Sequence, residues 1–213
     1  TVKCFEAEKG GLAQTLMMKI ARNKPSSVTL LNTQYRMHEE IMQFSSDWFY
    51  NGELKAAPDV QYRGILDYDS PIMWIDTSDT DWEESCVGNV GKLNKGEADI
   101  VINYLKQYID KIGIERILDE RIDFGVISPY RAQVRYLRKA IRTDKTFSRV
   151  RRLITVHTVD GFQGQERDVI FISLVRSNSD GNIGFLRDLR RMNVAMTRAR
   201  MKLVISGDAS TLS

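Results

Sequence analysis

The strongest constraint on the fold comes from residues 124–206, where short apolar runs of β type alternate with segments of helical spacing. The runs are 124–128, 153–157, 169–174 and 203–206, and the helical segments are 131–141 and 190–200. Strands that alternate with helices along a chain predict a parallel sheet, because a parallel pair needs a long crossover connection. We therefore expect an α/β fold with a doubly wound, mainly parallel sheet and helices on both faces.

Fewer regular signals precede this part of the chain. A short helix is predicted around residues 12–21, and Pro25 ends it. Residues 28–31 form a β-type run, and residues 72–75 form another. Residues 38–50 have helical spacing, and four large apolar side chains are expected on the core side of that helix: Ile41, Phe44, Trp48 and Phe49.

Residues 76–96 are polar, acidic and glycine-containing, which predicts a surface loop. At its end, Asn94 and Glu97 have the spacing of a capping box, in which one side chain caps the helix and the other reaches back to the cap. A helix is expected from about residue 97 to residue 111, because the apolar residues there repeat at helical spacing.

Charge is divided unevenly along the chain. Although the net charge is +3, residues 1–120 carry 13 Lys and Arg against 20 Asp and Glu, whereas residues 121–213 carry 18 against 8. A basic half of this kind suits phosphate, of nucleic acid or of nucleotide, and it equally suits a solvated surface that binds nothing. Charge alone leaves both interpretations open.

The length of 213 residues suits one α/β domain, and a hydrophobic fraction of 42% is ordinary for a soluble chain. No apolar run approaches the ~18 residues that span a bilayer, and residues 1–10 do not have the pattern of a signal peptide. Cys4 and Cys86 form no motif, as expected of reduced thiols. We therefore expect an intracellular protein with no membrane partner, in the cytoplasm or, in a eukaryote, the nucleus.

Four polar clusters accompany the predicted strands and the last predicted helix. They read Gln-Tyr-Arg-Met-His at 34–38, Ile-Ser-Pro-Tyr-Arg-Ala-Gln at 127–133, Thr-Val-Asp-Gly-Phe-Gln-Gly-Gln-Glu at 158–166 and Arg-Met-Asn-Val-Ala-Met-Thr-Arg-Ala-Arg at 191–200. Ligands of doubly wound sheets gather beyond the carboxyl ends of the strands. We expect residues 128–130, 157–166 and 207–208 to lie at that edge.

In this order and spacing, the clusters resemble the C-terminal motor domain of superfamily 1 helicases. The closest resemblance is to the Upf-like branch, which includes the nonsense-mediated-decay helicase and the immunoglobulin-mu-binding helicase. It implies a RecA-like fold of the P-loop NTPase type and an ATP-dependent helicase or translocase. Residues 1–27 resemble the lead-in from a preceding motor domain, which leaves residues 28–213 as the second RecA-like domain.

The resemblance implies an ATP site. Arg36 and Arg198 match the family's catalytic arginines, which stabilise the charge that develops on the transferring phosphoryl group. Tyr35 matches the ring that stacks on adenine, and Glu166 matches the carboxylate that accepts a hydrogen bond from the ribose. Gly164 is expected to allow close backbone approach. Without the resemblance, Arg198 could be a salt-bridged surface arginine and Tyr35 a core tyrosine.

The resemblance also implies a track for one strand of DNA or RNA. Five residues match positions at which the family touches phosphate, sugar or a base face: Ser128, Pro129, Tyr130, Arg131 and Thr158. Tyr130 could equally be a packing residue. Gln34 and Gln163 are expected to couple the nucleotide cleft to the strand-binding surface.

The sequence contains no glycine-rich phosphate loop with its lysine and no acidic metal-holding motif after an apolar strand. The family carries both on its first motor domain. ATP and Mg²⁺ are therefore expected to be held mainly by the N-terminal RecA-like domain of the same protein, and the isolated fragment is expected to be inactive. His38 and His157 lack ligand partners at suitable spacing, so no metal site is predicted in this chain.

One alternative is a non-catalytic module that binds nucleotide or nucleic acid and has kept the helicase fold but lost ATP hydrolysis. A scaffold that binds only proteins is a third interpretation, and it fits poorly with intact Arg36, Glu166 and Arg198. The sequence upstream in the parent gene separates the first two, because an intact phosphate loop there favours the enzyme.

Overall fold

Five strands form the central sheet, in the order β3-β9-β8-β6-β7. They are β3 (Ile72–Asp76), β6 (Phe124–Ser128), β7 (Ile154–Thr158), β8 (Arg167–Ser173) and β9 (Ala199–Gly207). Every neighbouring pair in this sheet is parallel, which confirms the predicted doubly wound α/β architecture. The structure is a computed structural model and describes residues 4–11, 14–88 and 91–212.

Strand β8 shows why the central strands read as continuous apolar runs. Its Val169 and Phe171 side chains belong to one hydrophobic core, and Ile170 and Ile172 belong to another. Successive side chains of a strand point to opposite faces, so a strand covered on both sides needs apolar residues throughout. Each face of the sheet therefore has its own core.

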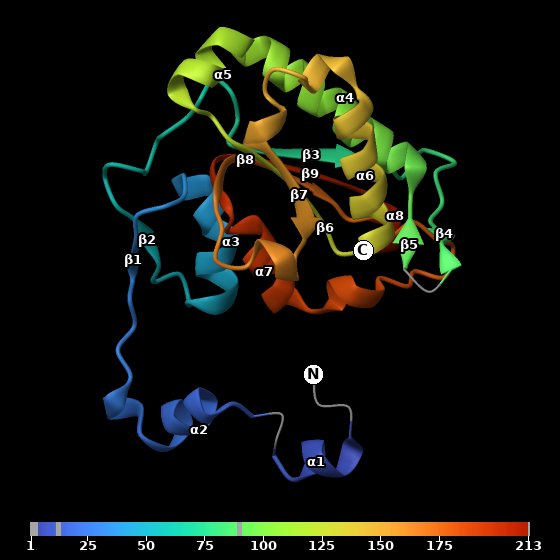
Figure 1. The fold of residues 1–213 in the computed structure, drawn as a ribbon. Coiled ribbons are helices and arrows are strands. Elements are labelled where there is room, and N and C mark those ends of the chain that lie inside the picture. Colours follow the sequence, from blue (N-terminus) through green and yellow to red (C-terminus); the bar gives the residue numbers. More distant parts are fainter. Residues whose placement is uncertain (1–3, 12–13, 89–90, 213) are drawn as a thin grey trace. The chain divides into compact units, whose positions relative to one another are not determined.

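Helices cover both faces of the sheet, as Figure 1 shows. Helices α4 (Lys95–Ile112), α5 (Ile114–Glu120) and α6 (Arg131–Thr143) pack on one face. Helices α3 (Glu39–Phe49) and α7 (Leu189–Met196) pack on the other. This arrangement leaves the two edges formed by the strand ends available for polar groups.

Smaller elements connect these layers. Strand β1 (Thr33–Gln34) pairs in parallel with β2 (Lys55–Ala56), and β4 (Ser85–Cys86) pairs antiparallel with β5 (Lys92–Leu93). The predicted surface loop of residues 76–96 therefore contains a short hairpin. The described chain after residue 32 also contains α8 (Ala209–Leu212) and the 3₁₀ helices η3 (Lys145–Phe147), η4 (Arg151–Leu153), η5 (Asp160–Phe162) and η6 (Gly184–Arg187).

The chain divides into two compact units, Thr1–Asn32 and Thr33–Ser213. The first contains α1 (Phe5–Lys9), α2 (Leu16–Asn23) and the 3₁₀ helix η1 (Pro25–Ser27). The predicted helix at 12–21 is thus shifted toward its C-terminus, and residues 12 and 13 lie outside the described residues.

The predicted strand at residues 28–31 is wrong. These residues form no strand, and Val28, Leu30 and Leu31 are exposed. A β-type run becomes a strand only when a partner strand supplies its backbone hydrogen bonds and buries one face. Pairing begins later, at Thr33 in β1.

Two helix predictions also need correction. The helix predicted at 190–200 ends at Met196, and Ala199 already begins β9, where it pairs with Arg167 of β8. Pairing with the sheet here overrides the local helical pattern. In α3, Trp48 is 64% exposed, and the side chains that turn inward are Ile41, Met42, Ser45 and Ser46.

Only half of the predicted capping box forms at the start of α4. The Asn94 Oδ1 accepts a hydrogen bond from the Glu97 backbone N–H at 3.0 Å, so Asn94 caps the helix. The Asn94 N–H, however, donates to the Gln133 Oε1 at 2.9 Å. The Glu97 carboxylate is therefore free to turn toward the sheet instead of back to the cap.

Candidate functional site

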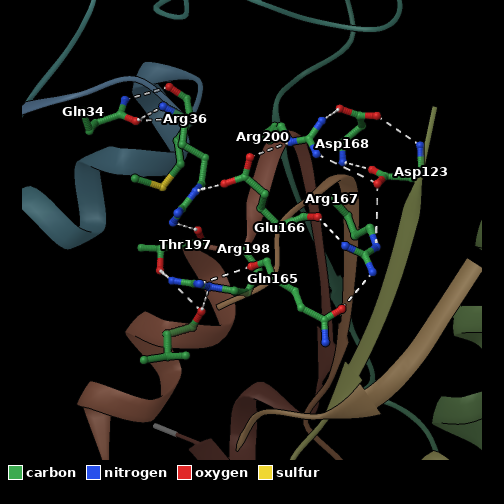
Figure 2. A network of polar contacts seen from close by, with 12 residues as sticks. Gln34, Arg36, Asp123, Gln165, Glu166, Arg167, Asp168, Thr197, Arg198 and Arg200 are labelled. Atoms are coloured by element: carbon green, nitrogen blue, oxygen red, sulfur yellow. Dashed lines mark hydrogen bonds and ion pairs between the residues drawn. The ribbon is translucent and has the colours of Figure 1, made fainter. Parts of the chain in front are cut away.

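The amino-terminal ends of β8 and β9 carry a cluster of arginines and carboxylates, drawn in Figure 2. Glu166 lies directly before β8 and forms ion pairs with Arg36 and Arg200. The Arg36 Nε donates to one carboxylate oxygen, and the Arg200 Nε lies 3.2 Å from the other. Both oxygens of Glu166 therefore face a guanidinium.

The two arginines predicted to be catalytic meet at Thr197. The Arg36 Nη1 donates to the Thr197 carbonyl at 3.1 Å, and the Arg198 Nη2 donates to the Thr197 hydroxyl at 3.2 Å. Arg36 comes from the turn after β1, and Arg198 comes from the short link between α7 and β9. The fold thus brings together two residues that are far apart in the sequence.

Within the described part of the chain, Arg198 is held by neutral acceptors and forms no ion pair. Its Nε donates to the Val194 carbonyl at 2.8 Å, and its Nη1 donates to the Gln165 carbonyl at 3.2 Å. Burial and the charge of Arg36 lower the pKa of Arg198, but a guanidinium still stays charged at neutral pH. The group is therefore fixed in place with its charge unpaired, which suits an anionic ligand.

Charge also controls the ionisation of Glu166. Burial alone would raise the pKa of this carboxyl, but the hydrogen bond and charge of Arg36, together with the charge of Arg200, outweigh burial. The pKa of Glu166 consequently lies below its ordinary value. A carboxylate that stays ionised is a strong acceptor for a hydroxyl group.

Sequence reasoning missed Arg200 as part of this cluster. Its Nη1 donates to the buried Asp168 at 2.8 Å, and its Nη2 lies 3.9 Å from Asp123. A helix at 190–200 would have pointed Arg198 and Arg200 to different faces. Because the strand begins at Ala199, both arginines lie near Glu166, and recognising the apolar alternation of β9 could have revealed this.

Gln34 fixes the turn that carries Tyr35 and Arg36. Its Oε1 accepts hydrogen bonds from the backbone N–H groups of Arg36 at 2.8 Å and Met37 at 2.7 Å. Its Nε2 donates to the Met37 carbonyl at 2.8 Å. The Tyr35 side chain is 72% exposed beside this turn, so its ring is available to a ligand.

The two glycines of the 158–166 segment, Gly161 and Gly164, are favoured for different structural reasons. Gly164 has φ of +80°, and a Cβ there would meet nothing within 4 Å, so its backbone conformation is what favours glycine. Gly161 is the position of close approach, since a Cβ would lie 1.6 Å from the His157 Nδ1. The side chain of Gln163 is exposed between them.

The carboxyl ends of β6 and β7 bring Ser128 and Thr158 side by side, as paired residues of the sheet. Ser128 is fully buried, so its hydroxyl cannot reach a bound strand in this conformation. The Thr158 Oγ1 is partly exposed and accepts from the Gly161 N–H at 3.3 Å. Pro129 follows Ser128 and is half-buried.

Tyr130 and Arg131 continue this edge into α6. The Tyr130 ring lies 6.5 Å from the Phe185 ring, and its hydroxyl accepts from the Arg176 Nη1 at 3.4 Å. Arg131 is exposed and is the first residue of α6, whose start has no side-chain cap. Free backbone N–H groups at a helix start attract anions such as phosphate.

The predicted site residues therefore lie at two opposite edges of the sheet. Thr158 lies at the carboxyl end of β7, as expected. The expectation that all of 157–166 lies at that edge is wrong, because Glu166 directly precedes β8, which runs parallel to its neighbours. The segment between them must cross from one edge to the other, and it links the two groups of predicted residues.

Histidines and cysteines add no metal site in the described residues, where no group of three or more His, Cys, Asp or Glu could hold an ion. The His38 Nδ1 caps α3 by accepting from the Glu40 N–H at 3.1 Å. The His157 Nδ1 accepts from the Thr158 N–H at 3.0 Å. No helix of the described ranges is long and apolar enough to span a membrane.

A family model described as an AAA domain, of the AAA_12 type, matches residues 12–210. The chain belongs to this family, which confirms the resemblance to a superfamily 1 helicase motor domain.

Three relatives illustrate the similarity. The DNA polymerase alpha-associated DNA helicase A of Saccharomyces cerevisiae is 38% identical over 94% of this chain and 31% of its own length. An ATP-dependent helicase of Methanocaldococcus jannaschii is 36% identical over 97% of this chain and 30% of its own. A regulator of nonsense transcripts 1 homolog of Neurospora crassa is 36% identical over 97% of this chain and 19% of its own. The chain thus spans less than a third of each.

Proposed function

We propose that this chain is the second motor domain of an ATP-dependent helicase or translocase that moves along single-stranded DNA or RNA. The observation that carries the proposal is the Arg198 guanidinium, which three hydrogen bonds to neutral acceptors hold in place without a carboxylate partner among the residues that the structure describes. A fixed and unpaired positive charge is what a transferring phosphoryl group needs, because negative charge develops on its oxygens.

Arg36 and Arg198 would together hold phosphate oxygens, since both reach Thr197. Tyr35 would offer its exposed ring to the adenine, and Glu166 would accept from a ribose hydroxyl. ATP supplies the phosphoanhydride bond whose hydrolysis drives movement. The described carboxylates form no group suited to Mg²⁺, so we propose that the N-terminal RecA-like domain of the same protein, from which residues 1–27 would lead in, holds the metal and most of the nucleotide.

The strand would cross the opposite edge of the sheet. Thr158 and Arg131 would contact phosphate there, helped by the uncapped N–H groups of α6, and Tyr130 would stack on a base face. Because Ser128 is buried, the backbone of Pro129 rather than the Ser128 hydroxyl would touch the strand.

The segment 158–166 would couple the two edges. At one end the Gly161 N–H donates to Thr158, and at the other the Gln165 carbonyl accepts from Arg198. A change in the position of Arg198 would therefore shift Thr158 as well, because a short, hydrogen-bonded stretch of chain connects the two residues. Gln34 would act at the nucleotide end by fixing the turn of Arg36, and the exposed Gln163 would contact the first motor domain or the strand.

The test is strand-stimulated ATP hydrolysis by the full-length protein that contains this chain, with Arg198→Ala compared against Arg190→Ala. Arg190 lies exposed on α7 and provides a matched loss of charge. We expect R198A to lower kcat by roughly 10³-fold or more while nucleotide affinity changes little, since the charge it meets is greatest in the transition state. Near-normal kcat in R198A would refute the proposal.

The alternative function is a non-catalytic module that binds nucleotide or nucleic acid. It predicts that the wild-type full-length protein binds both ligands but does not hydrolyse ATP faster when single-stranded DNA or RNA is added. The unpaired charge of Arg198 favours the enzyme, because a domain that only binds ligands does not need a guanidinium held for a transition state.

A further inference from the structure

Glu97 is a buried carboxylate that the proposed function does not use. It is fully buried in the first turn of α4, and its oxygens lie among donors at the carboxyl ends of β8 and β9. The Ser173 Oγ donates to its Oε1 at 2.6 Å and the Ser206 Oγ at 3.3 Å. In the described part of the chain it forms no ion pair, so only neutral donors offset its desolvation.

Buried amide groups extend this network to α6. The Gln133 Nε2 donates to the Ser173 Oγ at 2.9 Å and to the Asn94 carbonyl at 2.9 Å. Gln133, Ser173 and Ser206 are all fully buried. The network ties α4 and α6 to β8 and β9. Burying an acid without a cation partner costs desolvation free energy, and apolar side chains could hold these elements together without that cost.

Val175, just after β8, is the residue whose backbone conformation Glu97 stabilises most. Its φ is +73°, a left-handed conformation that β-branched residues rarely adopt and that stores strain. The Val175 N–H donates to both Glu97 oxygens, at 3.0 and 2.9 Å. An acceptor fixed at this point favours the strained conformation over its relaxed alternatives, and so it sets the direction in which the chain leaves β8.

That direction places Arg176. Its side chain is 5% exposed and lies 3.0 Å from Glu84, and its Nη1 donates to the Tyr130 hydroxyl at 3.4 Å. Gly184 closes the other side, because a Cβ there would lie 2.5 Å from the Arg176 Nη1 and 3.1 Å from the Tyr130 hydroxyl. Arg176 therefore fills a narrow space between Glu84, Gly184 and Tyr130.

We propose that Glu97 is a positioning residue for strand binding: by holding Val175 in its left-handed conformation, it places Arg176 so that Arg176 supports the Tyr130 ring. This inference rests on the proposed function, in which Tyr130 stacks on a base of the bound strand.

The first experiment compares Glu97→Gln with Asp110→Asn in the full-length protein. Asp110 lies exposed on the same helix and undergoes the same chemical change. In E97Q an amide N–H₂ replaces one acceptor and faces the Val175 N–H, which cannot turn away. Titrated with a labelled unstructured oligonucleotide, as DNA and as RNA, E97Q is expected to bind roughly tenfold more weakly than D110N. Binding of a labelled ADP should match in the two variants.

A double variant separates positioning from general damage. If Glu97 acts through Tyr130, then Tyr130→Ala alone weakens the oligonucleotide roughly tenfold, and adding E97Q to Y130A weakens it little further. Equal losses of oligonucleotide and ADP affinity in E97Q, or fully additive losses in the double variant, would overturn the inference. So would unchanged oligonucleotide affinity in E97Q.

Failure of the proposed function gives a different result. If Y130A binds the oligonucleotide as the wild type does, then the placement of the strand at Tyr130 is wrong, and the inference about Glu97 falls with it. If E97Q does not fold, Ser173→Ala carries the same test, because it removes one donor to Glu97 and leaves the carboxylate in place. S173A is then expected to show the same selective loss of oligonucleotide affinity, and an unchanged affinity overturns the inference.

Discussion

The two edges of the sheet hold their polar groups in different ways. At the amino edge, the Arg36 and Glu166 side chains are 36% and 40% exposed and pair with each other. At the carboxyl edge, Glu97 and Ser173 are fully buried and bond to each other and to the backbone. Exposed ion pairs contribute little to stability and can exchange one partner for another. Buried hydrogen bonds are costly to break.

The amino edge is built to exchange ion-pair partners, and the carboxyl edge is built to stay fixed. The Arg36–Glu166 pair can open toward a nucleotide, because water can solvate the released Arg36 and Arg200 still pairs with Glu166. The Glu97 network has no such freedom, and its effect is to fix the backbone after β8. The comparison predicts catalytic effects from changes at the amino edge and geometric or stability effects from changes at the carboxyl edge.

The largest expected effect concerns the amino edge, where ion-pair partners can exchange. Arg36→Ala in the full-length protein should lower kcat for strand-stimulated ATP hydrolysis by roughly 10³-fold, because an arginine that meets developing phosphoryl charge is lost. Arg152→Ala, which removes an exposed arginine from η4, is the control. Steady-state kinetics with both variants provide the measurement. If R36A raised KM and left kcat intact, Arg36 would be a ground-state ligand rather than a catalytic group.

The next largest effect concerns the carboxyl edge, and it is a dependence of the free energy of unfolding on pH. Burial raises the pKa of Glu97 to about 7 from an ordinary 4.5. Its hydrogen-bond donors, the Ser173 and Ser206 hydroxyls and the Val175 N–H, are uncharged. The folded protein therefore binds this proton more tightly than the unfolded chain. The resulting contribution to the free energy of unfolding is complete below about pH 4.5 and is lost as pH rises through about 7.

Glu97→Gln removes this titration, so the difference in unfolding free energy between wild type and E97Q should change by about 3 kcal/mol across that window. Urea unfolding at several pH values measures the difference, and Asp110→Asn serves as the control because its carboxyl is exposed. A difference that stays constant with pH would mean that the Glu97 carboxyl is not desolvated as its burial indicates.

How much of this was predictable depends on whether a pattern is local or tertiary. Strand β6 matches its predicted bounds, because an apolar run between turn residues needs no other information. The position of Glu166 at the amino edge was missed, although β7 and β8 follow one another in the chain and run in the same direction, which requires the segment between them to cross from one edge to the other. The role of Glu97 could not be predicted, because the capping pattern says nothing of the Ser173 and Val175 donors that draw its carboxylate away.

A smaller effect concerns the salt dependence of strand binding at the carboxyl edge. Arg131→Ala should reduce the slope of log affinity against log salt concentration by about 0.7, the value for one lost phosphate contact with a single strand. Arg135→Ala, exposed about one turn further along α6, is the matched control and should change the slope less. Oligonucleotide titrations at several salt concentrations measure both slopes. Equal slopes in the two variants would remove Arg131 from the proposed track.

The smallest expected effect concerns Glu166, the carboxylate of the amino edge. Burial would raise the pKa of Glu166, but the hydrogen bond and charge of Arg36 outweigh it, so the pKa lies below its ordinary value, opposite to Glu97. Its contribution to stability is thus present above the unfolded pKa and is lost as pH falls through the folded one. Because Glu166 is 40% exposed, solvent screens the pair, and Glu166→Gln should change the unfolding free energy at neutral pH by about 0.5 kcal/mol or less. Urea unfolding of E166Q beside E97Q makes the comparison direct. A loss of several kcal/mol in E166Q would show that the amino edge is also a rigid structural network and does not exchange partners freely.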